Sequence, residues 1–285
     1  MTGPLVWITG AHGLIGSYLV RSAPRRAPQW RVRGLTRAEV DLVDFAAVER
    51  EFLRDRPQLV IHCAALTVVG EAQKNPALAQ RVNVDVTEHL AQLAADIPFV
   101  FFSTDLVFDG RQGNYTETDA LNPLTVYGET KAMAEQVVLR NPRHLVVRTS
   151  INAGVTLAGG RSFNEMLRRS LQTAGAGMKL FTDEFRCPIA ATETAQAVWE
   201  LAQTGAAGIY HVAGATRLSR YEIARLLVQR WPEVTAEIAA GSAKDFPGPP
   251  RALDTSLSIA KVQGVLSRPL PGLAEWLAAH PQEPV

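Results

Sequence analysis

Three glycines near the start of the chain constrain its fold more than any other feature. Gly10, Gly13 and Gly16 follow an apolar run at residues 5–9, and residues 13–21 have the spacing of a helix. Glycine permits a tight turn, lets a diphosphate approach bare backbone, and allows the helix to pack close to the strand. The first turn of that helix then offers N–H groups to phosphate oxygens. The segment therefore predicts a strand, a dinucleotide-binding loop and a helix.

Short apolar runs alternate with longer amphipathic runs through the first half of the chain. Strand-like runs occupy residues 30–35, 58–65, 99–103 and 144–150, and helix-like runs occupy residues 45–54, 75–96 and 126–140. Strands that are apolar on both faces are typical of a parallel sheet covered by helices on both sides. We therefore predict an α/β fold with a doubly wound parallel sheet of the Rossmann type.

The second half of the chain has a looser pattern. Ser219 and Glu222 form a capping-box pattern, and helical spacing recurs at residues 163–173, 192–204 and 219–231. We predict a dinucleotide-binding Rossmann domain over residues 1–150. Residues 151–285 are expected to form mainly a smaller α/β substrate-binding region, with the stretch at residues 190–215 returning to the Rossmann domain.

The residues after the second apolar run indicate which nicotinamide cofactor the loop would bind. An acidic residue at this point would accept hydrogen bonds from the ribose 2′-hydroxyl of NAD. The chain instead has Thr36 and Arg37, and a guanidinium suits the 2′-phosphate of NADPH. We therefore expect NADPH, with NADH as the alternative if Arg37 is only a solvated surface charge. Cys63, Ala64 and Ala65 follow a later strand, where small side chains leave room for the cofactor.

A tyrosine and a lysine four residues apart form the candidate catalytic pair. Ser103 and Thr104 end an apolar strand, at the sheet edge where ligands bind in open α/β folds. Tyr127 and Lys131 follow on one face of a predicted helix. A nearby ammonium lowers the pKa of a phenol, Thr104 would bind a substrate oxygen, and Tyr127 would protonate the carbonyl that receives hydride. The alternative is an ordinary pair on a helix surface.

Composition excludes several other classes of protein. The formal net charge of +1 among 285 residues gives no electrostatic reason to bind nucleic acid or an anionic membrane. No apolar run reaches the length of about 18–20 residues that a membrane span needs. Cys63 and Cys187 are the only cysteines and lack the spacing of a disulfide framework or a zinc site, so no metal is expected. The N-terminus lacks the basic segment of a signal peptide, so we expect a cytoplasmic protein.

Eight sequence motifs follow one another over most of the chain. They are TGAHGLIG, DLVD, VIHCAALTVVGEAQKNPALAQRVNV, FFSTDLVFDG, NPLTVYGETKAMAEQ, LVVRTS, DEFRCPIAATETAQAV and GIYHVAG. This series resembles the dTDP-4-dehydrorhamnose reductase family, which belongs to the extended short-chain dehydrogenases/reductases. The resemblance implies a two-part fold that reduces the 4-keto group of a nucleotide-linked deoxysugar with a nicotinamide cofactor. It also implies that Thr104, Tyr127 and Lys131 are catalytic, with Tyr127 as the proton donor, and that Asp105 contacts the sugar.

The resemblance further implies the cofactor-binding residues and the assembly. Asp41 and Leu42, expected after a short third strand, would lie against the adenine. The complete expected set is Gly10, His12, Gly13, Leu14, Ile15, Gly16, Arg37, Asp41, Leu42, Cys63, Ala64, Ala65, Ser103, Tyr127 and Lys131. A homodimer is the default from base rates, and the predicted helix at residues 126–140 is the candidate face by family analogy.

Four residues depart from the family pattern on the substrate side. Leu106 stands where a tyrosine is expected, Ile151 where an aromatic residue is frequent, and Arg186 and Cys187 where a small, uncharged pair is usual. Arg186 would bind a phosphate or carboxylate of the substrate, or else form a salt bridge with a neighbour such as Asp183. The expected substrate contacts are Thr104, Asp105, Ile151 and Arg186.

Two alternatives to a reductase stay open. A nucleotide-sugar epimerase has the same fold. A non-catalytic regulatory subunit, which binds a dinucleotide and another enzyme, forms a branch of the family, although intact Tyr127 and Lys131 favour catalysis. A dehydratase is disfavoured, because its elimination chemistry uses a glutamate after Asp105 and the chain has Leu106 there.

Overall fold

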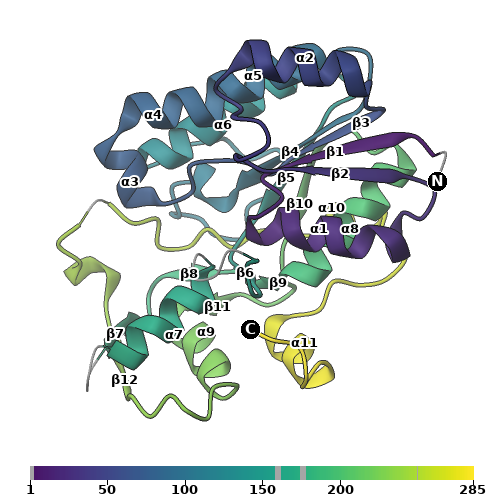
Figure 1. The fold of residues 1–285 in the computed structure, drawn as a ribbon. Coiled ribbons are helices and arrows are strands. Elements are labelled where there is room, and N and C mark those ends of the chain that lie inside the picture. The colour runs from purple at the N-terminus through teal and green to yellow at the C-terminus, as the bar shows by residue number, and fades with distance from the viewer. Residues whose placement is uncertain (1–2, 158–161, 174–177, 249) are drawn as a thin grey trace.

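Six parallel strands form the central sheet of the computed structural model, which describes residues 3–157, 162–173, 178–248 and 250–285. The strands lie in the order β10-β5-β4-β3-β1-β2 (Figure 1). Their bounds are β1 Leu5–Thr9, β2 Arg31–Leu35, β3 Leu59–His62, β4 Phe99–Thr104, β5 Leu145–Thr149 and β10 Gly208–Val212. All pairings in this sheet are parallel, which confirms the predicted doubly wound α/β fold.

Helices cover both faces of the sheet (Figure 1). One face carries α1 (Leu14–Arg26), α8 (Ala191–Thr204) and α10 (Ala260–Gln263), and the other carries α2 (Phe45–Asp55), α5 (Val86–Leu93) and α6 (Val126–Val138). Successive residues of a strand point to opposite faces, so Val6 and Ile8 pack in one apolar core and Trp7 packs in the other. No helix in the described part of the chain is long and apolar enough to cross a membrane.

The helix predicted at residues 75–96 is interrupted. The chain forms α3 (Val69–Lys74), α4 (Pro76–Gln80), a π-helical turn (Arg81–Asp85) and then α5. Pro76 has no N–H with which to continue α3. Within the π-helical turn, the Asn83 amide accepts a hydrogen bond from the Leu66 N–H at 2.8 Å and donates one to the Thr130 hydroxyl at 3.0 Å. Asn83 therefore joins the loop after β3 to α6.

The prediction of a short third strand before Asp41 and Leu42 is wrong. Residues 36–44 form turns between β2 and α2. The Asp41 carboxylate accepts a hydrogen bond from the Val43 N–H at 3.3 Å, and such a bond two residues along the chain favours a turn over a strand.

A smaller part of the molecule, here called the annex, has its own apolar core. The annex consists of α7 (Phe163–Thr173), β7 (Met178–Phe181), β8 (Phe185–Arg186), β11 (Leu218–Ser219), α9 (Arg220–Val228), β12 (Ile238–Gly241) and α11 (Leu273–Ala279). Leu167, Leu227 and Trp276 are buried together in its core. The predicted capping box is confirmed, since the Ser219 hydroxyl and the Glu222 carboxylate each accept a hydrogen bond from the other residue's N–H.

A short strand pairing joins the annex to the carboxyl side of the sheet. β6 (Asn152–Ala153) follows β5 directly and pairs with β9 (Ile189–Ala190), and Ala153 and Ala190 pack in the annex core. Within the annex, β8 pairs with β11 in the antiparallel sense. The elements α8 and β10 lie with the large sheet (Figure 1). The chain thus passes repeatedly between the two parts, whereas the division at residue 150 stays a prediction.

Candidate active site

The glycine loop lies tightly against the end of β3. Gly10 has φ of +66°, and a Cβ there would lie 2.8 Å from the Ala64 nitrogen. A Cβ at Gly16 would lie 2.3 Å from the Gly10 carbonyl oxygen, so α1 packs directly on the loop. Neither position accommodates a side chain, and both leave bare backbone beside the N-terminus of a 13-residue helix. This is the cradle that a dinucleotide diphosphate requires.

The loop after β2 presents Arg37 to solvent. The Ala11 N–H donates to the Leu35 carbonyl at 3.2 Å, which holds the glycine loop against the end of β2. The Arg37 side chain is 87% exposed and lies 3.6 Å from the Asp41 carboxylate. An exposed ion pair of this kind contributes little to stability, so Arg37 can exchange Asp41 for another anion at small cost.

Thr104 and Tyr127 come from two elements that meet at the carboxyl edge of the sheet. Thr104 ends β4, and its hydroxyl donates to the Asp105 carboxylate and accepts from the Leu106 N–H, both at 3.2 Å. Tyr127 is half-buried in the first turn of α6. Burial raises the pKa of Tyr127 to about 12, a hydrogen bond with Thr104 opposes this rise, and the Asp105 charge adds to it.

Lys131 lies one helical turn after Tyr127 and is buried. Its ammonium lies 3.9 Å from the centroid of the Phe101 ring. Burial lowers the pKa of Lys131 to about 7, although the Glu135 carboxylate raises it. The structure does not show the predicted lowering of the Tyr127 pKa by Lys131, since burial, Thr104 and Asp105 are the influences on that pKa and burial is the largest of them.

A buried ion pair fixes α6 to the sheet. The Arg148 guanidinium in β5 binds both carboxylate oxygens of Glu135, with its Nη2 at 2.7 Å from Oε2 and its Nε at 3.0 Å from Oε1. Glu135 and Lys131 are four residues apart on α6. Because a bidentate pair defines the orientation of both partners, the turn of α6 that carries Lys131 is held in one position.

Asp105 connects the catalytic edge to the annex. The Ser150 hydroxyl donates to its Oδ2 at 2.7 Å, and the Arg186 Nε lies 3.6 Å from the same oxygen. Asp105 and Arg186 are both buried. Asp183, the predicted partner of Arg186, instead accepts hydrogen bonds from the Ser242 hydroxyl and the Ala243 N–H.

Three arginines surround one fully buried carboxylate in the annex. Glu184 is 0% exposed and forms ion pairs with Arg186 at 3.0 Å, with Arg220 at 2.8 Å and with Arg251. Burial alone would raise the pKa of Glu184, but Arg220, Arg186 and Arg251 together hold it at about 2. The cluster therefore keeps a net positive charge at neutral pH.

A cavity of about 220 Å³ lies between this cluster and the sheet edge. Its lining residues come from both parts of the chain and are Val69, Gly70, Leu106, Phe108, Leu124, Thr125, Arg186, Arg220, Phe246, Pro250, Arg251 and Ala252. Leu106 and Arg186, two of the departures from the family pattern, thus face the same space. Ile151, the third, packs half-buried against the annex core and does not line the cavity.

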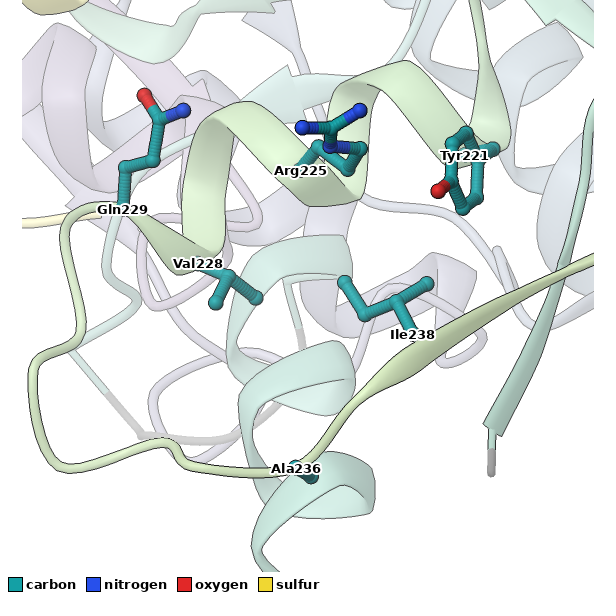
Figure 2. A pocket seen from close by; sticks show the side chains of 6 residues that line it. All are labelled: Tyr221, Arg225, Val228, Gln229, Ala236 and Ile238. Carbon is teal, nitrogen blue, oxygen red and sulfur yellow. The ribbon is translucent and has the colours of Figure 1, made fainter. Parts of the chain in front are cut away.

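A second hollow, of about 270 Å³, lies on the annex between α9 and β12 (Figure 2). Tyr221 and Arg225 on α9 and Gln229 directly after it supply its polar groups, while Val228, Ala236 and Ile238 form its apolar wall. It contains none of the predicted site residues, so the cavity at the sheet edge is the better candidate. Among the described residues, no group of three or more His, Cys, Asp or Glu side chains could hold a metal ion.

Comparison with known proteins identifies the family. The model of the RmlD substrate binding domain family matches residues 5–280. The chain belongs to this family. It is 34% identical to dTDP-4-dehydrorhamnose reductase of Mycobacterium tuberculosis, over 88% of this chain and 84% of that protein. It is 28% identical to methionine adenosyltransferase 2 subunit beta of Xenopus laevis, over 90% and 80%.

A solved RmlD-family structure has the same fold. The dTDP-4-dehydrorhamnose reductase of Bacillus anthracis, crystallised in complex with NADP, superposes with a TM-score of 0.88 at 23% identity, covering 98% of both chains. At this identity the superposition establishes the fold alone. The six-stranded sheet and the annex described above are therefore shared with that reductase.

Sequence reasoning missed most of the residues that give the cavity its charge. Arg220 opens α9, Arg251 lies in the loop after β12, and Glu184 precedes β8. No spacing in the sequence relates these three residues, since they meet only through the folding of the annex. The one signal in the sequence was the carboxylate of Glu184, which stands two residues before Arg186.

Proposed function

We propose that this protein is an NADPH-dependent reductase of a 4-keto deoxy nucleotide sugar, with hydride from the nicotinamide and a proton from Tyr127. The observation that carries the proposal is that Thr104 at the end of β4 and Tyr127 in the first turn of α6 lie at the same edge of the sheet, beside a cavity to which three arginines contribute. Membership of the RmlD family and the M. tuberculosis relative named as a reductase support it.

The residues around the glycine loop fit a dinucleotide. Gly10 and Gly16 allow the loop, the end of β3 and α1 to pack closely, which leaves bare backbone at the N-terminus of α1 for a diphosphate to approach. Arg37 lies at the end of β2, where a guanidinium can bind a 2′-phosphate. When bound, NADPH would supply hydride to a carbonyl carbon. The B. anthracis structure with NADP supports NADPH over NADH.

Arg220 and Arg251 are the proposed diphosphate ligands of the nucleotide sugar. Each binds Glu184 through its Nε, and within the described residues their terminal nitrogens have no hydrogen-bond partner. The Arg251 guanidinium lies against the rings of Phe181 and Phe246, at 5.0 and 4.9 Å from their centroids. Two held guanidinium groups suit a diphosphate, which accepts paired hydrogen bonds from each.

Tyr127 is the proposed proton donor and Thr104 the proposed ligand of the carbonyl oxygen. With a pKa of about 12, the phenol is protonated at neutral pH and starts the reaction in the donor form. The Thr104 hydroxyl lies at the same edge of the sheet as Tyr127, where it donates a hydrogen bond to Asp105. As a carbonyl oxygen gains negative charge during hydride addition, both hydroxyls stabilise that charge, and Tyr127 transfers its proton.

A panel of nucleotide sugars with NADPH consumption as the readout tests the proposal. We expect turnover with a 4-keto-6-deoxy nucleotide sugar and none with the corresponding 4-hydroxy sugar. If NADPH binds but none of the 4-keto sugars is reduced, the chain is not a reductase of this class. Product analysis separates the epimerase alternative, which would invert a stereocentre without net consumption of NADPH.

A regulatory role is the second candidate, because the X. laevis relative is named as a subunit of another enzyme. The intact Tyr127 and Lys131 favour catalysis over this role.

We also propose a cytoplasmic homodimer with α6 in its interface, since Met133 on α6 and Leu78 on the nearby α4 are exposed and apolar. Light scattering during size-exclusion chromatography would test the dimer, and a monomer at micromolar concentration would contradict it.

A further inference from the structure

Arg186 contacts four different groups although its side chain is only 3% exposed. Its Nη1 donates to the Phe185 carbonyl at 2.7 Å and to the Ala252 carbonyl at 3.1 Å. Its Nη2 lies 3.0 Å from the Glu184 carboxylate, and its Nε lies 3.6 Å from the Asp105 carboxylate. With its donors directed at the protein, Arg186 is a poor ligand for a substrate and a good connection between segments.

These contacts form a continuous path from the arginine pair to the catalytic hydroxyls. At one end, Arg220 and Arg251 hold Glu184. Ala252, whose carbonyl accepts from Arg186, is the direct neighbour of Arg251 in the chain. The other end of the path is the hydroxyl of Thr104, which donates to Asp105 at 3.2 Å.

We propose that Arg186 is a positioning residue that couples occupation of the Arg220–Arg251 pair to the orientation of Thr104 beside Tyr127. The inference rests on the proposed reductase function and adds to it a route by which the diphosphate of the substrate assists reduction of its distant sugar carbonyl. Arg186 is one of the residues at which the sequence departs from the expected family pattern.

The physical reason is competition for the guanidinium groups. A diphosphate carries at least two negative charges and binds the same arginines that Glu184 binds. When Arg220 and Arg251 turn towards the diphosphate, the negative charge of Glu184 is balanced more by Arg186. The loop at Ala252 shifts together with Arg251. Arg186 transmits both changes to Asp105, whose carboxylate determines where the Thr104 hydroxyl points. Binding energy from a remote group then lowers the barrier at the reacting carbon.

Kinetics of Arg186 variants distinguish positioning from substrate binding. We expect Arg186→Gln to lower kcat about tenfold with the sugar nucleotide while KM stays within roughly threefold, because the loss occurs in the transition state. If Arg186→Gln does not fold, Arg186→Lys takes its place, because it keeps the buried charge. Its kcat should also fall, since one ammonium cannot replace four directed contacts. An unchanged kcat, or a rise in KM alone, would overturn the proposal.

Arg217→Gln is the matched control. Arg217 forms an ion pair with Asp254 at 2.8 Å and lies over the Phe185 ring, but it contacts neither Glu184 nor Asp105. We expect it to keep the wild-type kcat. If Arg217→Gln lowers kcat as much as Arg186→Gln does, the effect is a general disturbance of the annex and the coupling is refuted.

A substrate in two pieces tests the coupling itself. The pieces are a small α-hydroxy ketone, which lacks a nucleotide, and inorganic pyrophosphate. Pyrophosphate is expected to accelerate NADPH-dependent reduction of the ketone about tenfold in the wild type and less than twofold in Arg186→Gln. Calorimetry should show that both proteins bind pyrophosphate with similar affinity. Equal acceleration in both proteins, or none in the wild type, would overturn the coupling.

The two proposals fail in different ways. A wild-type protein that reduces no 4-keto nucleotide sugar contradicts the proposed function. A wild-type protein that reduces one, together with Arg186 variants of unchanged kcat, contradicts only the coupling.

Discussion

The cofactor side and the substrate side of this molecule are built in contrasting ways. On the cofactor side, Gly10 to Gly13 form one continuous loop between β1 and α1, and Gly16 lies in the first turn of α1. On the substrate side, Arg186, Arg220 and Arg251 reach a single carboxylate from three separate segments. The first arrangement is local and depends on backbone geometry, whereas the second exists only when the annex has folded. Substitutions should therefore affect the two sides independently.

Tyr127→Phe should have the largest effect. It removes the proton donor while the ring continues to fill its place, so we expect kcat to fall about a thousandfold or more. NADPH affinity, measured by fluorescence titration, should not change. Turnover at the wild-type rate would show that another group donates the proton.

Arg251→Ala should raise KM for the sugar nucleotide by roughly 10- to 100-fold, because charged hydrogen bonds to the diphosphate are lost. The affinity for NADPH should be unaffected, which is the sharpest test of the separation between the two sides. Arg225→Ala, on the outer hollow of Figure 2, is the control that should leave KM unchanged. Similar KM values for both variants would remove Arg251 from the substrate site.

Arg37→Ala should act only on the cofactor side. We expect NADPH to bind about tenfold more weakly and NADH to bind as before, since only NADPH has a 2′-phosphate. Arg50, an exposed arginine on α2, offers a matched control. Equal weakening of both cofactors would eliminate the proposed contact with the 2′-phosphate.

The smallest predicted effect is the pH dependence of the free energy of unfolding that the buried Lys131 causes. Burial lowers its pKa from 10.5 to about 7, so between these pH values the unfolded chain binds a proton that the folded chain does not. The free energy of unfolding should therefore rise with pH across this window. Relative to Lys131→Met, denaturant titrations should show the wild type becoming more stable from pH 7 to pH 9. A difference that is constant with pH would contradict the buried, uncharged amine.

The contrast between the two sides also explains what the sequence could predict. The glycine loop depends on residues that are neighbours in the chain, and Gly10 and Gly16 have the tight backbone contacts that their spacing indicated. The alternation of apolar runs likewise predicted the parallel sheet. Both features follow from local pattern and period.

Other features depended on tertiary contacts that no local pattern encodes. The π-helical turn at Asn83 interrupts a helix whose spacing looked continuous, because Asn83 bonds to both Leu66 and Thr130. The pKa of Tyr127 depends on how deeply the fold buries its hydroxyl, which a pair four residues apart does not determine. Arg186 was predicted to bind an anionic group of the substrate or to pair with a neighbour such as Asp183, whereas in the structure it pairs with Glu184 and Asp105.

Transfer of a labelled hydride would show whether this protein reduces a sugar carbonyl. Purified protein would be mixed with NADPH carrying deuterium at the transferable position of the nicotinamide and with a 4-keto-6-deoxy nucleotide sugar. We expect one deuterium at C4 of the product sugar for each NADPH consumed, and no labelled product with Tyr127→Phe. Unlabelled sugar recovered with unchanged NADPH, although both ligands bind, would contradict it.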